Sequence, residues 1–208
     1  MKVVLVNGSP NMQGCTYTAL SEVAVTLNKE GIETQIFQLG KKPVSGCMAC
    51  QKCSQLKRCI INDSVNEFSE LAATADGFVF GSPVYFASAS GSITSFMDRA
   101  FYSQRSKYRL KPAAAVVSAR RAGTTAALDQ LNKYFTISQM PVISSSYWNM
   151  VHGFTPDDVR RDLEGLQVMR NLGRNMAWFL KCKEAAAAAG VPLPEKEPQI
   201  MTNFHSVQ

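Results

Sequence analysis

The stretch Val3-Val-Leu-Val-Asn-Gly-Ser-Pro10 opens the chain with a continuous apolar run that ends in a polar turn. A short apolar run bounded by turn residues is typical of a strand buried on both faces of a parallel sheet. The same Gly-Ser-Pro turn returns at Gly81-Ser-Pro83, directly after the run 77–81. The two turns therefore predict two buried parallel strands that end in similar loops.

Outward from these strands, strand and helix patterns alternate along the chain. Apolar runs predict strands at residues 3–7, 34–39, 77–81, 113–118 and 142–146. Helical periodicity with capping and stop residues predicts helices at 16–29, 64–75, 89–101, 124–139 and 156–189, the last as one long helix or two joined ones. Alternation without an internal repeat predicts an α/β three-layer sandwich, in which helices cover both faces of a five-stranded parallel sheet. Five strands favour the flavodoxin-like order 2-1-3-4-5.

Composition places these elements in one domain and excludes several kinds of partner. Of the 208 residues 46% are hydrophobic and 18% charged, which predicts a domain at 1–190 with a cysteine-rich loop at 43–62 and a Pro-rich tail at 191–208. The net charge is +6, but the cations stand in scattered pairs, so we expect no nucleic acid partner. No apolar stretch approaches membrane-spanning length and the start lacks a signal-peptide pattern, so we expect a cytoplasmic protein with no membrane partner.

The loop after the first strand is a candidate phosphate site. Ser9, Thr16 and Thr18 offer hydroxyl donors around the start of a predicted helix, whose N-terminus attracts anions. The loop has no Gly-x-x-x-x-Gly-Lys pattern and no Gly-x-Gly-x-x-Gly pattern, so a nucleotide triphosphate or a dinucleotide fits poorly. A monophosphate such as that of FMN fits best, and an ordinary turn with capping hydroxyls is the alternative.

The loops after the third and fourth strands are expected at the same sheet edge. Pro83-Val-Tyr-Phe86 combines a rigid strand end with two aromatics, and we expect it to form a shelf for a flat ring. The alternative is that Tyr85 and Phe86 pack in the core. Ser118-Ala-Arg-Arg-Ala-Gly123 offers backbone donors and two guanidinium groups, at Arg120 and Arg121, for an anionic ring or a nicotinamide phosphate. Solvated arginines are the alternative there.

Four cysteines stand close together in the loop at 43–62. Cys47, Cys50, Cys53 and Cys59 are separated by two, two and five residues. Thiolates at this spacing can hold a 4Fe–4S cluster or a tetrahedral zinc ion, and they can also be free thiols on a surface loop. Neighbours this close in sequence are poorly placed for disulfides with one another.

These motifs together resemble a known family. Asn7-Gly-Ser-Pro, Gly14-Cys-Thr, Gly81-Ser-Pro-Val-Tyr-Phe and Phe96-Met-Asp-Arg99 resemble the NADPH-dependent FMN reductase branch of the flavodoxin-like superfamily. With its four clustered cysteines, the chain is similar to the iron–sulfur flavoprotein subgroup. The resemblance implies one FMN per subunit, NAD(P)H or a ferredoxin as electron donor, and a homodimer or homotetramer.

The resemblance also implies roles for individual positions. The phosphate and ribityl chain of FMN would be held by Ser9, Asn11, Thr16, Tyr17 and Thr18. The ring would be held at its edges by Pro83, Val84, Tyr85 and Phe86 and on its pyrimidine side by Ser118, Arg120, Arg121 and Gly123. Two positions depart from the family pattern: Cys15 stands where a polar residue is common, and Ala122 where a second glycine is common.

Three functions are compatible with this reading of the sequence. The first is an FMN-dependent NAD(P)H oxidoreductase that passes electrons to a small acceptor such as a quinone, a flavin, an azo or nitro compound, or a metal ion. In that enzyme flavin N5 carries the chemistry and no catalytic side chain is needed. The second is an iron–sulfur flavoprotein electron carrier that is reduced by ferredoxin and not by NAD(P)H. The third is a zinc-bearing interaction module with a vestigial flavin site.

Four further residues carry expectations about packing. Asp98 and Arg99 are expected to form a buried pair with a structural role. Tyr147 and Trp148, which follow the predicted strand at 142–146, border either the flavin or the core.

Overall fold

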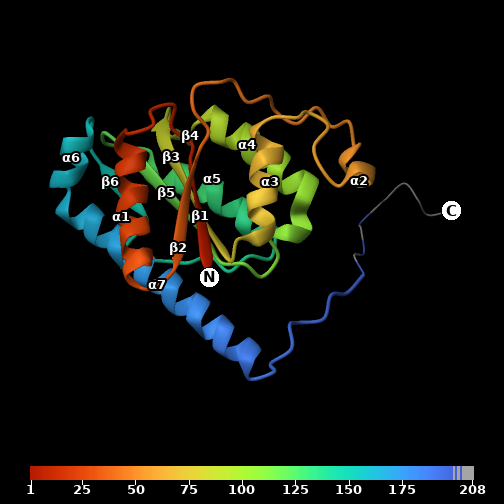
Figure 1. The fold of residues 1–208 in the computed structure, drawn as a ribbon. Coiled ribbons are helices and arrows are strands. Elements are labelled where there is room, and N and C mark those ends of the chain that lie inside the picture. Colours follow the sequence, from red (N-terminus) through yellow and green to blue (C-terminus); the bar gives the residue numbers. More distant parts are fainter. Residues whose placement is uncertain (199, 201, 203–208) are drawn as a thin grey trace.

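The computed structural model of the chain describes residues 1–198, 200 and 202. It is a three-layer α/β sandwich around a twisted sheet (Figure 1). The parallel strands are β1 (Lys2–Asn7), β2 (Glu33–Gln38), β3 (Gly77–Tyr85), β5 (Ala113–Ala119) and β6 (Met150–His152). Their order, β2-β1-β3-β5-β6, is the predicted flavodoxin-like order, and the two-residue strand β4 (Ser88–Ala89) forms a hairpin with β3 outside that path.

Helices cover both faces of the sheet. One face carries α1 (Cys15–Lys29), α6 (Pro156–Arg161) and α7 (Leu163–Ala188), and the other carries α3 (Ser64–Thr74), α4 (Gly91–Gln104) and α5 (Thr124–Ile137). The predicted long final helix is thus two joined helices. Two short helices, α2 (Cys53–Leu56) and the 3-10 helix η1 (Arg105–Lys107), lie in connecting segments.

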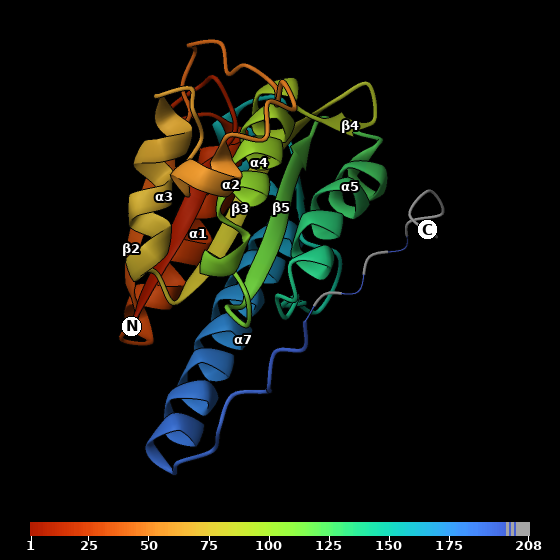
Figure 2. The same cartoon turned by 90° about the vertical axis from the view of Figure 1, so that its right-hand side faces the viewer.

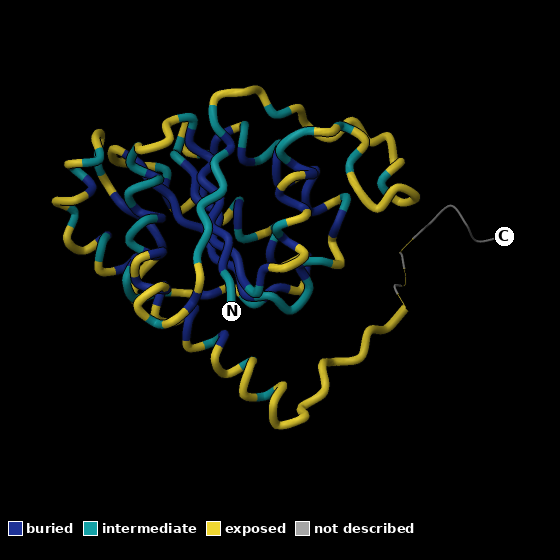
Figure 3. Tube along the Cα trace, viewed as in Figure 1, coloured by how far each residue is buried: buried dark blue, intermediate teal, exposed yellow. Residues whose placement is uncertain are grey.

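The sheet separates two apolar cores because its side chains alternate between the faces. On β1, Val4 and Val6 join the aromatic-rich core beneath α3, α4 and α5, while Val3 and Leu5 join the aliphatic core beneath α1 and α7. Figure 3 shows these buried segments at the centre of the molecule. Strands that are apolar on both faces therefore explain the continuous apolar runs of the sequence.

The predicted fifth strand at 142–146 is wrong. Val142 makes only an isolated bridge to Ala113, and the strand at this edge is β6, paired through Met150 with Val117. Between them the chain leaves the sheet and contacts α7. Ser145 donates a hydrogen bond to the carbonyl of Val168 at 2.6 Å, and similar contacts involve Ser144 and Ser146. The three serines find their partners on a helix, so the edge strand is interrupted there.

The C-terminal part of the chain leaves the body after α7, which extends past the lower end of the sheet (Figure 2). Residues 191–198 are exposed and carry no helix or strand. Arg109 donates a hydrogen bond to the Pro194 carbonyl at 3.1 Å, which brings this segment back beside the body. The rest of the predicted tail, residues 199, 201 and 203–208, lies outside the described residues. Among the described residues, no helix has the length and apolarity needed to cross a bilayer.

Candidate functional site

Three loops meet at the carboxyl edge of the sheet, at the top of Figure 1. The predicted turn at Gly81–Pro83 is wrong, because these residues continue β3 and pair with Val116–Ser118 of β5. Asn7, which precedes the first Gly-Ser-Pro segment, pairs with Gly81, and the Gly8 amide donates to the Gly81 carbonyl at 2.8 Å. The hydroxyls of Thr16 and Ser118 lie 2.8 Å apart. The segments that the sequence singled out therefore contact one another at the carboxyl ends of β1, β3 and β5.

The loop after β1 is held by a network around Ser9, which is only 5% exposed. The Ser9 amide donates to Asn7 Oδ1 at 3.1 Å, and the Asn11 amide donates to Ser9 Oγ at 3.2 Å. Gln38, on β2, donates to the Ser9 carbonyl at 2.7 Å and accepts from Asn7 at 2.6 Å. The loop is thus preorganised, while Asn11 itself is exposed. Of the other predicted residues in this segment, Tyr17 is half-buried and Thr18 donates to the Gly14 carbonyl at 3.2 Å.

The helices that begin at these loops differ from the other long helices at their N-termini. The long helices α3, α4 and α7 begin with side-chain caps at Asp63, Ser90 and Asp162, and the six-residue helix α6 begins with one at Thr155. In the described structure, α1 and α5 begin at Gly14 and Gly123 with neither a side-chain cap nor an acidic residue in the first turn. Their first backbone N–H groups therefore have no side-chain cap as acceptor, and no acidic residue of the first turn offsets the positive end of either helix dipole.

The shelf predicted at Pro83–Phe86 is the end of a tight hairpin. Phe86 and Ala87 join β3 to β4 and both have positive φ, 51° and 59°, as in the two-residue turns that match strand twist. Phe86 is fully exposed and Tyr85 is 49% exposed, so the alternative of core packing is wrong. A Cβ on Gly123, which has a φ of +91°, would lie 2.6 Å from the Ala87 Cα. Glycine thus lets the loop after β5 touch the hairpin, and Arg120 and Arg121 on that loop are exposed.

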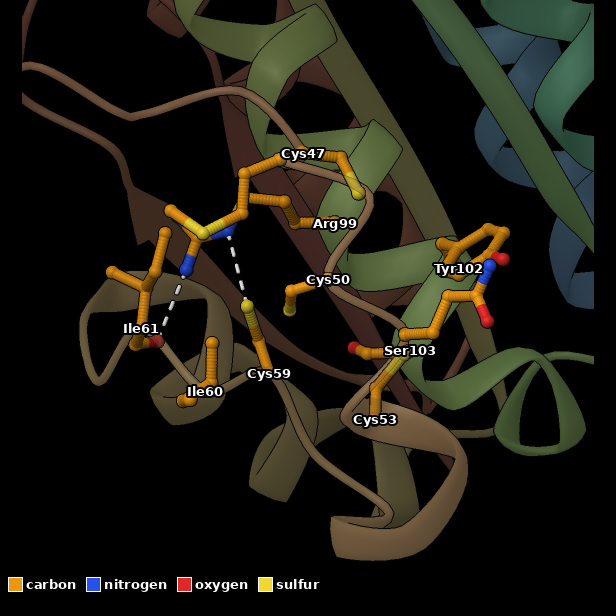
Figure 4. Close-up of a pocket in the computed structure, with 11 residues that line it drawn as sticks. Cys47, Cys50, Cys53, Cys59, Ile60, Ile61, Arg99, Tyr102 and Ser103 are labelled. Atoms are coloured by element: carbon orange, nitrogen blue, oxygen red, sulfur yellow. Dashed lines mark hydrogen bonds between the residues drawn. The ribbon is translucent and has the colours of Figure 1, made fainter.

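The four clustered cysteines line one pocket, together with Arg99, Tyr102 and Ser103 of α4 (Figure 4). Cys47 and Cys50 are exposed, and Cys53 and Cys59 are half-buried. Among the described residues, no three His, Cys, Asp or Glu side chains are grouped closely enough to hold a metal ion. The four cysteines therefore line one pocket, but their side chains do not converge on a common point as metal ligands do.

Two features of this pocket fit a sulfur-ligated metal centre. The donor set, four thiols, suits zinc or an iron–sulfur cluster. The Ser103 hydroxyl oxygen lines the same pocket, is buried and finds no hydrogen-bond partner among the described residues. A buried hydroxyl without a partner is costly, so a ligand that accepts a hydrogen bond from Ser103 would remove that cost.

Arg99 is the residue of this site that sequence reasoning assigned to the wrong partner. The predicted pair with Asp98 is not formed: Asp98 accepts a hydrogen bond from Tyr134 at 2.5 Å, whereas Arg99 pairs with Asp63 at 2.6 Å. Arg99 also donates to Cys59 Sγ at 3.2 Å. Burial lowers the pKa of the Arg99 guanidinium, but its hydrogen bonds to Asp63 and Cys59 outweigh that effect and raise the pKa above its ordinary value. Successive helical residues point about 100° apart, which is the signal that could have separated these two side chains.

Tyr147 and Trp148 lie in the segment that interrupts the edge strand. Both are exposed, at 54% and 56%, and their rings form an edge-to-face pair with centroids 4.9 Å apart. Core packing, one of the two expectations for them, is therefore wrong.

Comparison with known proteins adds to this geometry. The family model for NADPH-dependent FMN reductase matches residues 1–155, which contain all three loops and the cysteine pocket. The chain belongs to this family. The FMN reductase family consists of FMN-binding, flavodoxin-like oxidoreductases, and the fold described above is theirs.

Two relatives of this chain carry different names. An iron–sulfur flavoprotein of Methanocaldococcus jannaschii is 33% identical over 190 residues, covering 87% of this chain and 98% of that one. An FMN reductase (NADPH) of Pseudomonas putida is 30% identical over 98 residues, which cover 47% of this chain and 46% of that protein. Among solved structures, a flavodoxin from the domain Archaea superposes with a TM-score of 0.57 at 15% identity, covering 87% of this chain and 99% of that one.

Proposed function

We propose that this protein binds FMN at the three loops on the carboxyl edge of the sheet and transfers electrons through it to a small acceptor. Bound FMN supplies one- and two-electron transfer chemistry. The uncapped N-terminus of α1 would receive the phosphate, with Ser9, Asn11, Thr16, Tyr17 and Thr18 around it. The observation that supports this best is that only the helices at the predicted flavin loops, among the long helices described, begin without side-chain caps.

The other two loops would hold the ring of the flavin. The hairpin Pro83–Phe86 offers an exposed aromatic surface, and the contact between Gly123 and Ala87 fixes its distance from the loop after β5. Ser118, near the end of β5, is held in place by its hydrogen bond with Thr16. Arg120 and Arg121 are exposed beside the second uncapped helix, where their charges would favour an anionic ring or the phosphate of a nicotinamide donor.

We further propose that Cys47, Cys50, Cys53 and Cys59 bind a 4Fe–4S cluster. The shared pocket, the unpartnered Ser103 hydroxyl and the name of the M. jannaschii relative, which matches nearly the full chain, support a cluster over free thiols. Zinc remains the competing ligand for four thiolates. Bound iron would supply single-electron transfer, and the donor would then be a ferredoxin.

Direct reduction by NAD(P)H is the second candidate, because the matching family is described as NADPH-dependent. Small acceptors for either route are quinones, free flavins, azo or nitro compounds and metal ions. We also propose that the protein is a homodimer or homotetramer and that it is cytoplasmic.

Anaerobic purification followed by cofactor analysis tests the proposal. We expect a flavin spectrum, stoichiometric FMN, and iron with acid-labile sulfide in the wild-type protein. The variant Cys50→Ser should lose iron and sulfide and keep FMN, whereas Cys182→Ser, at an exposed cysteine on α7, should keep all three. A colourless protein that carries zinc would contradict both cofactor assignments and would favour the interaction module.

Kinetics with two donors then separate the two routes. If ferredoxin is the donor, reduced ferredoxin bleaches the flavin band rapidly in wild-type protein and slowly in Cys50→Ser. If NAD(P)H is the donor, NADPH or NADH is consumed in steady state with a quinone acceptor, and Cys50→Ser retains that activity. The second result would rule out the cluster as an obligatory relay.

A further inference from the structure

Arg99 joins the two ends of the cysteine loop. It projects from α4 and is only 2% exposed. Its Nη1 donates to the carbonyl of Ser45, which precedes Cys47, at 3.3 Å, and its Nη2 donates to the carbonyl of Ile61, which follows Cys59, at 3.0 Å. One side chain on a rigid helix therefore fixes the positions at which the segment with all four cysteines leaves and rejoins the body.

The same guanidinium faces one of the cysteine sulfurs. Its Nε donates to Cys59 Sγ at 3.2 Å, and Figure 4 shows this bond beside the one to Ile61. The two remaining donors bind Asp63 in a bidentate pair, at 2.6 and 2.9 Å. All five N–H groups thus have acceptors, which is what a buried guanidinium requires. The position of its charge is consequently well defined.

We propose that Arg99 is a positioning residue of the metal centre, which holds the cysteine loop in place and makes a cluster bound there easier to reduce. The inference rests on the proposed function, in which Cys59 is a cluster ligand. Hydrogen bonds to cluster sulfurs and nearby positive charge favour the reduced, more negative form and so raise the reduction potential. The neighbouring helix residue Asp98, which binds Tyr134, has no part in this arrangement.

Limited proteolysis of the metal-free protein tests the first part of this role. The loop contains three trypsin sites, at Lys52, Lys57 and Arg58. Arg99→Gln and Arg99→Lys should both be cut in the loop several-fold faster than wild type, because each loses bonds to Ser45 and Ile61. The control Arg105→Gln, at an exposed arginine just after α4, should be cut at the wild-type rate. Equal rates in all four proteins would overturn the clamping role.

The reduction potential of the reconstituted protein tests the second part. Arg99→Gln should shift the cluster potential to a more negative value, and Arg99→Lys, which keeps the charge and loses the fork, should shift it less. Asp63→Asn breaks the ion pair and retains both Arg99 and a residue suited to cap α3, so it should give no negative shift. If Arg99 acted only through the structure of the loop, Asp63→Asn and Arg99→Gln would shift the reduction potential of the cluster in the same direction and by a similar amount.

The outcomes separate this inference from the proposed function. If wild-type protein takes up iron and sulfide but Arg99→Gln, or Arg99→Lys should the former not fold, has the wild-type potential, the tuning role of Arg99 is wrong. If wild-type protein takes up neither, the cluster assignment fails, and proteolysis still decides whether Arg99 holds the loop.

Discussion

Asp98 and Arg99 show how two neighbouring residues can serve different parts of one protein. The first points to Tyr134 on α5, and the second crosses beneath the cysteine loop to Asp63. Asp63 in turn caps α3 by accepting from the Val65 amide at 3.1 Å. Asp63 at the start of α3, Arg99 of α4 and Cys59 of the cysteine loop therefore form one hydrogen-bonded unit. Adjacency in sequence is a poor guide to such partners.

Tyr108 places a polar atom without a hydrogen-bond partner in the aromatic core. Its ring is fully buried and stacks on Phe101 with centroids 4.4 Å apart, but its hydroxyl has no hydrogen-bond partner among the described residues. Burial raises the pKa of Tyr108 above its ordinary value of 10.0. Below that pH the hydroxyl is neutral in both states, and above it only the unfolded chain ionises, so this residue lowers stability as the pH rises past 10.0.

We expect Tyr108→Phe to stabilise the protein at neutral pH by about 1 kcal/mol, because the unpaired hydroxyl is removed and the ring is kept. Its stability should also fall less than that of wild type when the pH is raised past the ordinary tyrosine pKa. Urea denaturation at the two pH values measures both effects. Tyr102→Phe, at a 64% exposed tyrosine, is the control and should match wild type. A destabilised Tyr108→Phe would show that the hydroxyl has a partner in solution.

At the scale of elements, the presence or absence of an N-terminal side-chain cap separates two kinds of helix. Capped helices such as α3 and α4 satisfy their own first N–H groups, whereas α1 and α5 leave theirs open at the sheet edge. An uncapped helix is less stable by about 1 kcal/mol than a capped one. That cost is reasonable where a ligand supplies the missing acceptors.

The variant Gln13→Glu places a negative charge beside the start of α1 with almost no change in shape. It should weaken FMN binding roughly two- to five-fold, through repulsion of the phosphate, and the effect should shrink as salt is added. Gln167→Glu, at an exposed position on α7, which contributes none of the proposed FMN-binding residues, should bind FMN as wild type does. Fluorescence titration of the apoprotein measures the affinities. Identical affinities for both variants would argue against the α1 N-terminus as the phosphate site.

At the scale of the whole molecule, the three loops belong to different strands, so a ligand that spans them stabilises the entire fold. FMN at about 100 times its Kd should add about 2.7 kcal/mol to the free energy of unfolding. For a domain of this size that corresponds to a rise in Tm of roughly 5–10 °C. Riboflavin, which lacks the phosphate, should raise the Tm less at the same concentration. A thermal unfolding series with both ligands tests this, and equal shifts would show that the phosphate is not bound.

Much of the architecture could be predicted from local patterns. Apolar runs located β1, β2, β3 and β5, and turn and cap residues bounded the helices to within a few residues. One failure lay at Gly81–Pro83, where the expected turn is a continuation of β3. Another lay at 142–146, where an apolar start followed by serines looked like a strand. Those serines instead bond to α7, a contact between segments distant in sequence that periodicity cannot reveal.

The amino-acid sequence by itself determined the alternation of strands and helices, the doubly covered sheet and the four thiols in one loop, because each depends on residues close together in the chain. Only the tertiary structure decided that the three loops touch, that the hairpin at Phe86 is exposed and that Arg99 binds Asp63 and Cys59. These contacts join residues from separate elements, and their partners depend on how the strands are ordered and where each helix turns its side chains. That geometry arises only when the sheet and its helices pack together.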